Sequence, residues 1–125
     1  MMAQVLLIDD DTSNLDFMQT VMHMEGHELA WAPDGAEGLA LARQLHPQLI
    51  ICDVVMPRLG GYAVLETVRA DPELSRVPVL LFSAGMTEDA RIMGLRRGAT
   101  EVLGKPFELQ RLRGAIKRCL EQEQR

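Results

Sequence analysis

Residues 5–11 read VLLIDDD, in which four branched apolar residues run without interruption into three aspartates. The apolar run is too short for a helix, and it lacks the polar–apolar alternation of a strand with one exposed face. An unbroken run of this kind is typical of a strand that is buried on both faces, as in a parallel sheet. We therefore expect a buried strand over residues 5–8, with the aspartates at its carboxyl end.

Two other stretches repeat this pattern. Residues 49–52 read LIIC and are followed by Asp53, and residues 77–82 read VPVLLF and are followed by Ser83. Both runs are rich in branched residues and end abruptly at a polar side chain, so both predict buried strands. Weaker strands are expected at 27–32 and 100–104.

Helical patterns occupy the intervals between these strands. We expect helices over residues 12–25, 34–46, 61–70, 87–98 and 108–122. Ser13, Asp34 and Thr87 are placed to cap helix starts, because a short polar side chain there accepts hydrogen bonds from the first free N–H groups. Pro47 and Gly98 mark helix ends, since proline cannot continue a helix and glycine commonly closes one.

The order of elements is therefore strand–helix repeated five times. Parallel strands need right-handed helical crossovers, so this order predicts an α/β fold of the flavodoxin-like (βα)5 type. We expect a five-stranded parallel sheet of order 2-1-3-4-5, with the most apolar strands central and helices on both faces. A chain of 125 residues has room for one domain, here 1–125, in which the polar residues 121–125 are a candidate linker.

Composition excludes several classes of function. The net charge of −5 argues against a surface that binds nucleic acid directly. No apolar run approaches the roughly 18–20 residues that span a bilayer, and the first residues lead into a strand rather than a charged signal sequence. Cys52 and Cys119 lie in apolar or helical patterns, as reduced buried thiols do. We therefore expect a cytoplasmic protein without membrane contact.

The chemistry is expected at one edge of the sheet, because ligands of open α/β sheets bind outside the carboxyl ends of the strands. Asp9, Asp10 and Asp53 carry −3 there and Lys105 carries +1, which leaves a local charge of −2. A divalent cation would neutralise it, and an all-oxygen site of this kind suits Mg²⁺ or, as an alternative, Mn²⁺. A metal ion beside a carboxylate nucleophile and a lysine is the arrangement that phosphoryl transfer uses. No glycine-rich phosphate loop follows residues 5–8, which argues against a nucleotide site.

Four segments at these strand ends match a known family. They read VLLIDDD (5–11), IICDVVMPRLGGYAVL (50–65), VPVLLFSAG (77–85) and GATEVLGKPF (98–107). In this order they resemble, over the whole chain, the receiver domain of response regulators in two-component signalling, the CheY-like superfamily. The resemblance implies a signalling phosphoprotein rather than an enzyme, which takes its phosphoryl group from a histidine kinase or a histidine phosphotransfer protein.

The resemblance also assigns roles to residues. Asp53 would be the phosphoacceptor and also a Mg²⁺ ligand. The ion would further be held by Asp10 directly, by Asp9 largely through water and by the backbone carbonyl of Val55. The phosphoryl oxygens would be bound by three groups, namely the hydroxyl of Ser83, the backbone N–H of Ala84 and the ammonium of Lys105. The bond between Lys105 and Pro106 would be cis. Asp11 matches no ligand position, and we interpret it as part of the helix start.

One position departs from the family pattern. The family couples phosphorylation to an aromatic residue on the fifth strand, which reshapes the face made by the fourth helix, fifth strand and fifth helix toward a downstream target. Here that position is Val102, which has no ring to move. Two possibilities stay open: the switch works by loop and helix displacement alone, or the domain passes its phosphoryl group onward.

Two alternative readings also stay open. The first is a Mg²⁺-dependent phosphohydrolase with an aspartyl-phosphate intermediate, although such enzymes normally carry a second acid two residues after the nucleophile, where this chain has Val55. The second is a receiver that belongs to a longer regulator or hybrid kinase.

Overall fold

Five strands form one parallel sheet of order β2-β1-β3-β4-β5 in the computed structural model, which describes residues 2–106 and 108–123. The strands are β1 (Gln4–Ile8), β2 (Glu28–Ala32), β3 (Leu49–Asp53), β4 (Val79–Ala84) and β5 (Glu101–Lys105). The predicted fold class and strand order are therefore confirmed. The three most apolar strands lie at the centre, and the two weaker ones form the edges.

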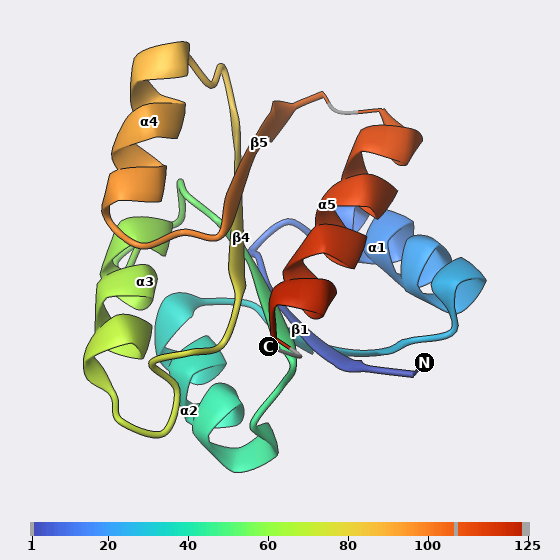
Figure 1. Cartoon of the computed structure of the whole chain (residues 1–125), viewed down its shortest axis with the longest axis horizontal. Helices are drawn as coiled ribbons and strands as arrows, with labels where there is room; N and C mark the ends of the chain where they lie inside the picture. The colour runs from blue at the N-terminus through green and yellow to red at the C-terminus, as the bar shows by residue number, and fades with distance from the viewer. Residues whose placement is uncertain (1, 107, 124–125) are drawn as a thin grey trace.

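The helices cover both faces of this sheet. One face carries α1 (Thr12–Glu25) and α5 (Leu109–Glu123), and the other carries α2 (Gly35–Leu45), α3 (Gly61–Ala70) and α4 (Glu88–Arg96), as Figure 1 shows. Among the described residues, none of these helices combines the length and the apolar character that crossing a bilayer requires.

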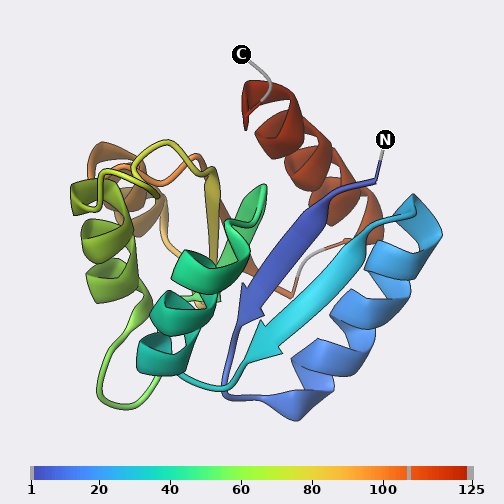
Figure 2. The same cartoon turned by 90° about the horizontal axis from the view of Figure 1, so that it is seen from below.

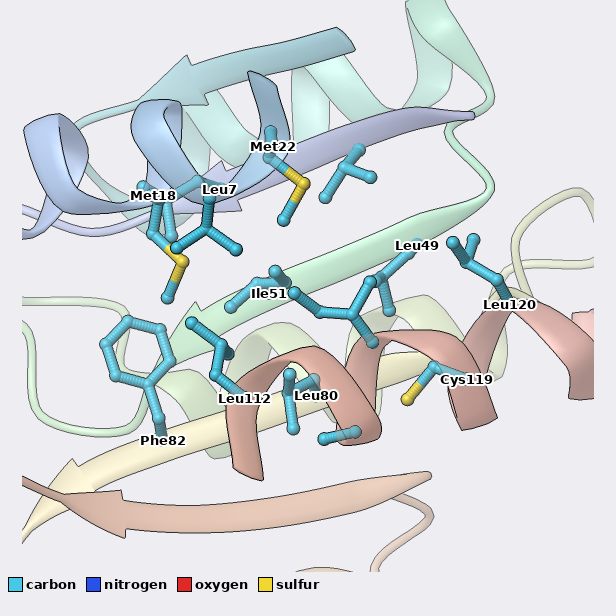
Figure 3. Close-up of a cluster of buried hydrophobic side chains, with 14 of the residues drawn as sticks. Leu7, Met18, Met22, Leu49, Ile51, Leu80, Phe82, Leu112, Cys119 and Leu120 are labelled. Atoms are coloured by element: carbon cyan, nitrogen blue, oxygen red, sulfur yellow. The ribbon is translucent and has the colours of Figure 1, made fainter. Parts of the chain in front are cut away.

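The strand residues alternate between two cores, which explains why the central strands are apolar throughout. Leu7, Ile51 and Leu80 are fully buried and pack toward α1 and α5 (Figure 3). Leu6 and Ile50 face the opposite way, into a second cluster that α2 and α3 complete. Because helices cover both faces of the sheet, a polar side chain in either set would be buried away from water. Both sets are therefore apolar.

The helix starts agree with prediction at two positions and differ at a third. The side chains of Asp34 and Thr87 accept hydrogen bonds from backbone N–H groups at the starts of α2 and α4, as expected of N-caps. The predicted capping role of Ser13 is wrong, because Asp11 occupies that position and its Oδ1 accepts from the Ser13 N–H at 2.9 Å. Asp11 thus has the helix-start role that we expected of it.

β4 lies further along the chain than its apolar run indicates. β4 begins at Val79 rather than Val77, because Pro78 has no N–H to donate and the Val77 N–H bonds to Leu74 in a turn. At its other end β4 continues through Ser83 to Ala84. The residues expected to carry the chemistry therefore include final residues of strands, which hold their side chains more rigidly than loops do.

The ends of two predicted segments need a comment. Residues 121–123, expected to belong to a linker, lie in the last turn of α5. Phe107, which ends the fourth matching segment, and residues 124–125 lie outside the described residues.

Candidate functional site

The strand order brings the predicted acids to one edge of the sheet. β1 and β3 are neighbours, and their chains emerge at the same edge because they run parallel. In Figure 2 the arrowheads of β1 and β2 point toward that edge. Asp9 follows β1 directly, and Asp53 is the last residue of β3.

Asp9, Asp10 and Asp53 form a compact acidic cluster. One carboxylate oxygen from each residue lies within 4.8 Å of the others. Asp9 is fully buried and Asp53 is nearly so, whereas Asp10 is exposed. The cluster therefore sits in the protein surface with one acid open to solvent, which gives a cation an approach from outside.

Asp9 is fixed by hydrogen bonds on every side. Its Oδ1 accepts from the Asp11 N–H at 3.0 Å, and its Oδ2 accepts from the Asn14 amide at 2.8 Å. Its backbone carbonyl accepts from the indole N–H of Trp31 at 2.8 Å. Its own N–H bonds to the Ala32 carbonyl at 3.1 Å.

Sequence reasoning missed two of these neighbours, Asn14 and Trp31. Asn14 lies in the first turn of α1, so a polar side chain just after an aspartate run was the available signal. Trp31 reaches Asp9 only because β2 pairs with β1 in the register that sets Trp31 beside Leu7. No pattern in the sequence alone specifies that register.

The surroundings of Asp9 raise the pKa of its carboxyl group. Burial is the main cause, and the negative charge of Asp53 adds to it, while the hydrogen bonds from Asp11 and Asn14 and the charge of Lys105 act in the opposite direction. A cation bound at the cluster would favour the ionised form of this carboxyl group, because an opposite charge stabilises a carboxylate.

Asp53, a member of this cluster, also contacts a lysine. Its Oδ2 is 3.4 Å from the Lys105 Nζ, and its Oδ1 accepts from the Val55 N–H at 3.3 Å. The Lys105 Nζ also lies 4.6 Å from the centre of the Phe82 ring, a cation–π distance that helps to hold the ammonium beside the carboxylate.

Ser83 and Ala84 lie beside Lys105 through strand pairing. β4 and β5 pair Ser83 with Gly104 and Ala84 with Lys105. Ser83 is 6% exposed, and its hydroxyl donates to the Ala84 carbonyl at 3.3 Å. The Lys105–Pro106 bond is cis. A hydroxyl, a strand-end residue and an ammonium thus lie along one stretch of the sheet edge next to Asp53.

The donor set of the acidic cluster fits a hard divalent cation. All three candidate ligands offer carboxylate oxygens, and Val55, two residues after Asp53, is 72% exposed. Oxygen ligands with room for water are what Mg²⁺ takes, since it keeps several waters of its octahedral shell. Among the residues that the structure describes, no sulfur or imidazole belongs to the cluster, so its ligands favour a hard metal over a softer one.

Val102 is buried beneath α4. It is 7% exposed, and a Cβ built on Gly94 of α4 would lie 3.0 Å from its Cγ2. Further along β5, a Cβ on Gly104 would lie 2.9 Å from the Cβ of Met86, in the loop between β4 and α4. Small residues thus let both the helix and the loop lie close on β5. A hollow of about 340 Å³ at this place is lined by Met86, Val102, Gly104 and Lys105, among others.

Several known proteins are similar to this chain in sequence and fold. The family model of the response regulator receiver domain matches residues 5–117. The protein PilH of Pseudomonas aeruginosa is 32% identical over 119 residues, which is 95% of this chain and 98% of PilH. The chemotaxis protein CheY4 of Vibrio cholerae has a solved structure with a TM-score of 0.88 and 32% identity, and the match covers 96% of this chain and 100% of that one.

Other relatives are longer. The transcriptional regulator RpaA of Synechocystis sp. is 34% identical over 125 residues, a match that covers 99% of this chain and 52% of RpaA. The chain therefore spans about half the length of that regulator and nearly the whole of PilH.

Proposed function

The chain belongs to the family of response regulator receiver domains of two-component systems, and from this premise we propose that Asp53 accepts a phosphoryl group from a histidine kinase or a histidine phosphotransfer protein. The observation that carries the proposal is the position of Asp53, which has a carboxylate oxygen within 4.8 Å of those of Asp9 and Asp10 and another 3.4 Å from the Lys105 ammonium. A nearly buried carboxylate in this setting is held in one orientation as a nucleophile.

The transfer step exchanges one bond to phosphorus for another. An Asp53 oxygen attacks the phosphorus of the donor phosphohistidine, the phosphorus–nitrogen bond breaks, and its electron pair stays on the imidazole nitrogen, which then takes a proton. Mg²⁺ supplies neutralisation of charge on the phosphoryl oxygens when it is bound. The groups that would hold the ion are the carboxylates of Asp9, Asp10 and Asp53 and the backbone carbonyl of Val55.

Three donors of the chain would bind the new phosphoryl oxygens. The Lys105 ammonium is already beside Asp53, and the Ser83 hydroxyl and the Ala84 N–H lie on the neighbouring strand end. The acyl phosphate replaces one negative charge by roughly −1.5 to −2. Rotation of the Ser83 hydroxyl away from the Ala84 carbonyl toward a phosphoryl oxygen would therefore gain a charge-assisted hydrogen bond.

We place the output on the face formed by α4, β5 and α5. The loop between β4 and α4 follows Ser83 and Ala84 directly, and Met86 in that loop lies against Gly104 of β5. A shift of Ser83 toward a phosphoryl group would therefore move the loop that contains Met86 and change its contact with β5. This coupling would not need an aromatic residue in place of Val102. The downstream target recognised by this face, or a further phosphoryl acceptor, would be a protein in the cytoplasm.

A phosphohydrolase is the second candidate, and the side chain of Val55 weighs against it. Val55 stands where that class carries its general acid–base, and it is exposed and apolar. Incubation with small phosphodonors in Mg²⁺ separates the two. A receiver becomes labelled once per molecule, whereas continuous release of phosphate from phosphate esters, with no labelled protein, would contradict the proposal.

A further inference from the structure

Asn14 of α1 and Trp31 of β2 both donate hydrogen bonds to Asp9, and neither residue takes part in the proposed transfer step. The Asn14 amide comes from the first turn of α1 and donates to Asp9 Oδ2 at 2.8 Å. The indole N–H of Trp31 comes from β2 and donates to the Asp9 carbonyl at 2.8 Å. Both bonds have the length of well-formed hydrogen bonds.

These bonds leave Asp9 little freedom. Asp11 donates to the other carboxylate oxygen, and Ala32 accepts from the Asp9 N–H, so that the backbone and both ends of the carboxylate are anchored. The side chain is fully buried. Each carboxylate oxygen accepts one of these hydrogen bonds. The partners thereby fix the orientation of the carboxylate, and with it the directions of the lone pairs that remain free to bind.

We propose that Asn14 and Trp31 are positioning residues of the cation site, which aim the Asp9 carboxylate at a Mg²⁺-bound water. This inference rests on the proposed function, because it takes the acidic cluster as a Mg²⁺ site. The Asn14 amide sets the rotation of the carboxylate, and the Trp31 indole sets the backbone from which the carboxylate projects.

The alternative for Trp31 is a purely apolar role. Its ring packs at the margin of the core cluster between the sheet and α1, and a buried indole N–H needs some acceptor. A phenyl ring would supply apolar contact without an N–H that must be satisfied. The feature that favours a positioning role is the acceptor of the Trp31 indole N–H. It is the backbone carbonyl of Asp9, a candidate ion-binding residue.

The alternative for Asn14 is a local helix-start contact. Asparagine has a lower helix propensity than alanine, so in an exposed turn it destabilises the helix unless its side chain makes a compensating hydrogen bond. Here Asn14 lies three residues after the N-cap Asp11 but bonds to Asp9 instead. Its neighbour Ser13 contacts the N-cap residue itself, with its hydroxyl donating to Asp11 Oδ1 at 2.6 Å.

The test measures the affinity of the whole chain for Mg²⁺ alone by calorimetry. Asn14→Ala removes the amide donor. Trp31 is the single tryptophan, so a tryptophan auxotroph can replace it by benzothienylalanine, which keeps the ring size and lacks the N–H. Ser13→Ala is the matched control, because it removes a hydrogen bond of the same turn that does not reach Asp9.

We expect about 10-fold weaker Mg²⁺ binding for Asn14→Ala and a several-fold loss for the benzothienylalanine protein, since partners of metal ligands commonly contribute 10–100-fold. Ser13→Ala should bind like the unaltered protein, and thermal unfolding in chelator should show all three proteins folded. Unchanged affinity in either test protein overturns the role of that residue. Absence of Mg²⁺ binding by the unaltered protein overturns the proposed cation site, and the positioning role with it.

Discussion

Single side chains set the lifetime of the proposed acyl phosphate, because water must be oriented to attack it. Val55 lies two residues after Asp53 and offers no hydrogen bond from its side chain. Gly85 lies two residues after Ser83 and has φ of 64°, a conformation that favours glycine, so the position carries no side chain that could act on water. Neither position therefore offers a side chain that could orient a water for attack.

We expect the phosphorylated protein to be long-lived, with a half-life of minutes to hours in Mg²⁺ buffer without a phosphatase. Val55→Glu introduces a carboxylate that can accept a proton from water, and it should shorten the half-life by about 10-fold or more. Loss of label from purified phosphoprotein measures both rates. A half-life of seconds for the unaltered protein would refute this prediction.

His27 should make stability depend on pH. Its Nδ1 accepts a hydrogen bond from the Ala3 N–H at 2.9 Å, so the folded state needs the neutral imidazole. Burial is the main cause that lowers the pKa of His27 below 6.5. Its stabilising contribution is therefore complete above pH 6.5 and is lost as the pH falls below that value.

Urea unfolding at pH 7.5 and pH 5.5 tests this. The unaltered protein should lose more free energy of unfolding over that interval than His27→Gln, whose amide oxygen can still accept from the Ala3 N–H and does not titrate. Equal losses in the two proteins would show that the imidazole does not contribute in this way.

At the scale of elements, α3 is tied to the phosphoacceptor by Gly61, its first residue. A Cβ at this position would fall on the Asp53 carbonyl oxygen and lie 2.8 Å from the Val54 Cα. Both atoms belong to the backbone, which cannot move aside as the end of a side chain can. Only glycine lets α3 begin so close to the end of β3.

Gly61→Ala should therefore destabilise the protein by about 2 kcal/mol, as overpacking commonly does. Gly114→Ala in α5 is the matched control, because its new methyl group meets only the flexible end of Arg118. The control should be stabilised by roughly 0.5–1 kcal/mol from helix propensity. Chemical denaturation measures both values, and a Gly61→Ala protein as stable as the control would contradict the packing described here.

The elements also show what a sequence can predict. The apolar runs before Asp9, Asp53 and Ser83 determine strands by burial alone, and the sheet order agrees with the flavodoxin-like arrangement in which the most apolar strands are central. The boundary of β4 was missed because it depends on the hydrogen bonding of Val77 and Pro78.

The contacts of Asn14 and Trp31 were missed for a related reason. They depend on how a helix and a neighbouring strand meet Asp9 in space. Sequence patterns predict which residues are buried and which cap helices. Contacts between a helix and a strand depend in addition on strand register and helix orientation, which only packing in three dimensions determines.

At the scale of the whole molecule, strand order creates the site. β1 and β3 are adjacent, and β4 and β5 continue from β3 on one side, so the acids, the Ser83 hydroxyl and the Lys105 ammonium lie along a single edge. An order that moved β5 away from β3 and β4 would separate Lys105 from Asp53. The chemistry is thus a property of the topology, although each residue is unremarkable where it stands in the sequence.

The most direct test of the central claim is covalent labelling at Asp53. The unaltered protein, Asp53→Asn and the control Asp16→Asn, an exposed aspartate of α1, are incubated with acetyl phosphate and Mg²⁺ and examined by intact mass. We predict the gain of one phosphoryl group in the unaltered protein and the control, and none in Asp53→Asn. A phosphoryl group gained by Asp53→Asn to the same extent would contradict the account.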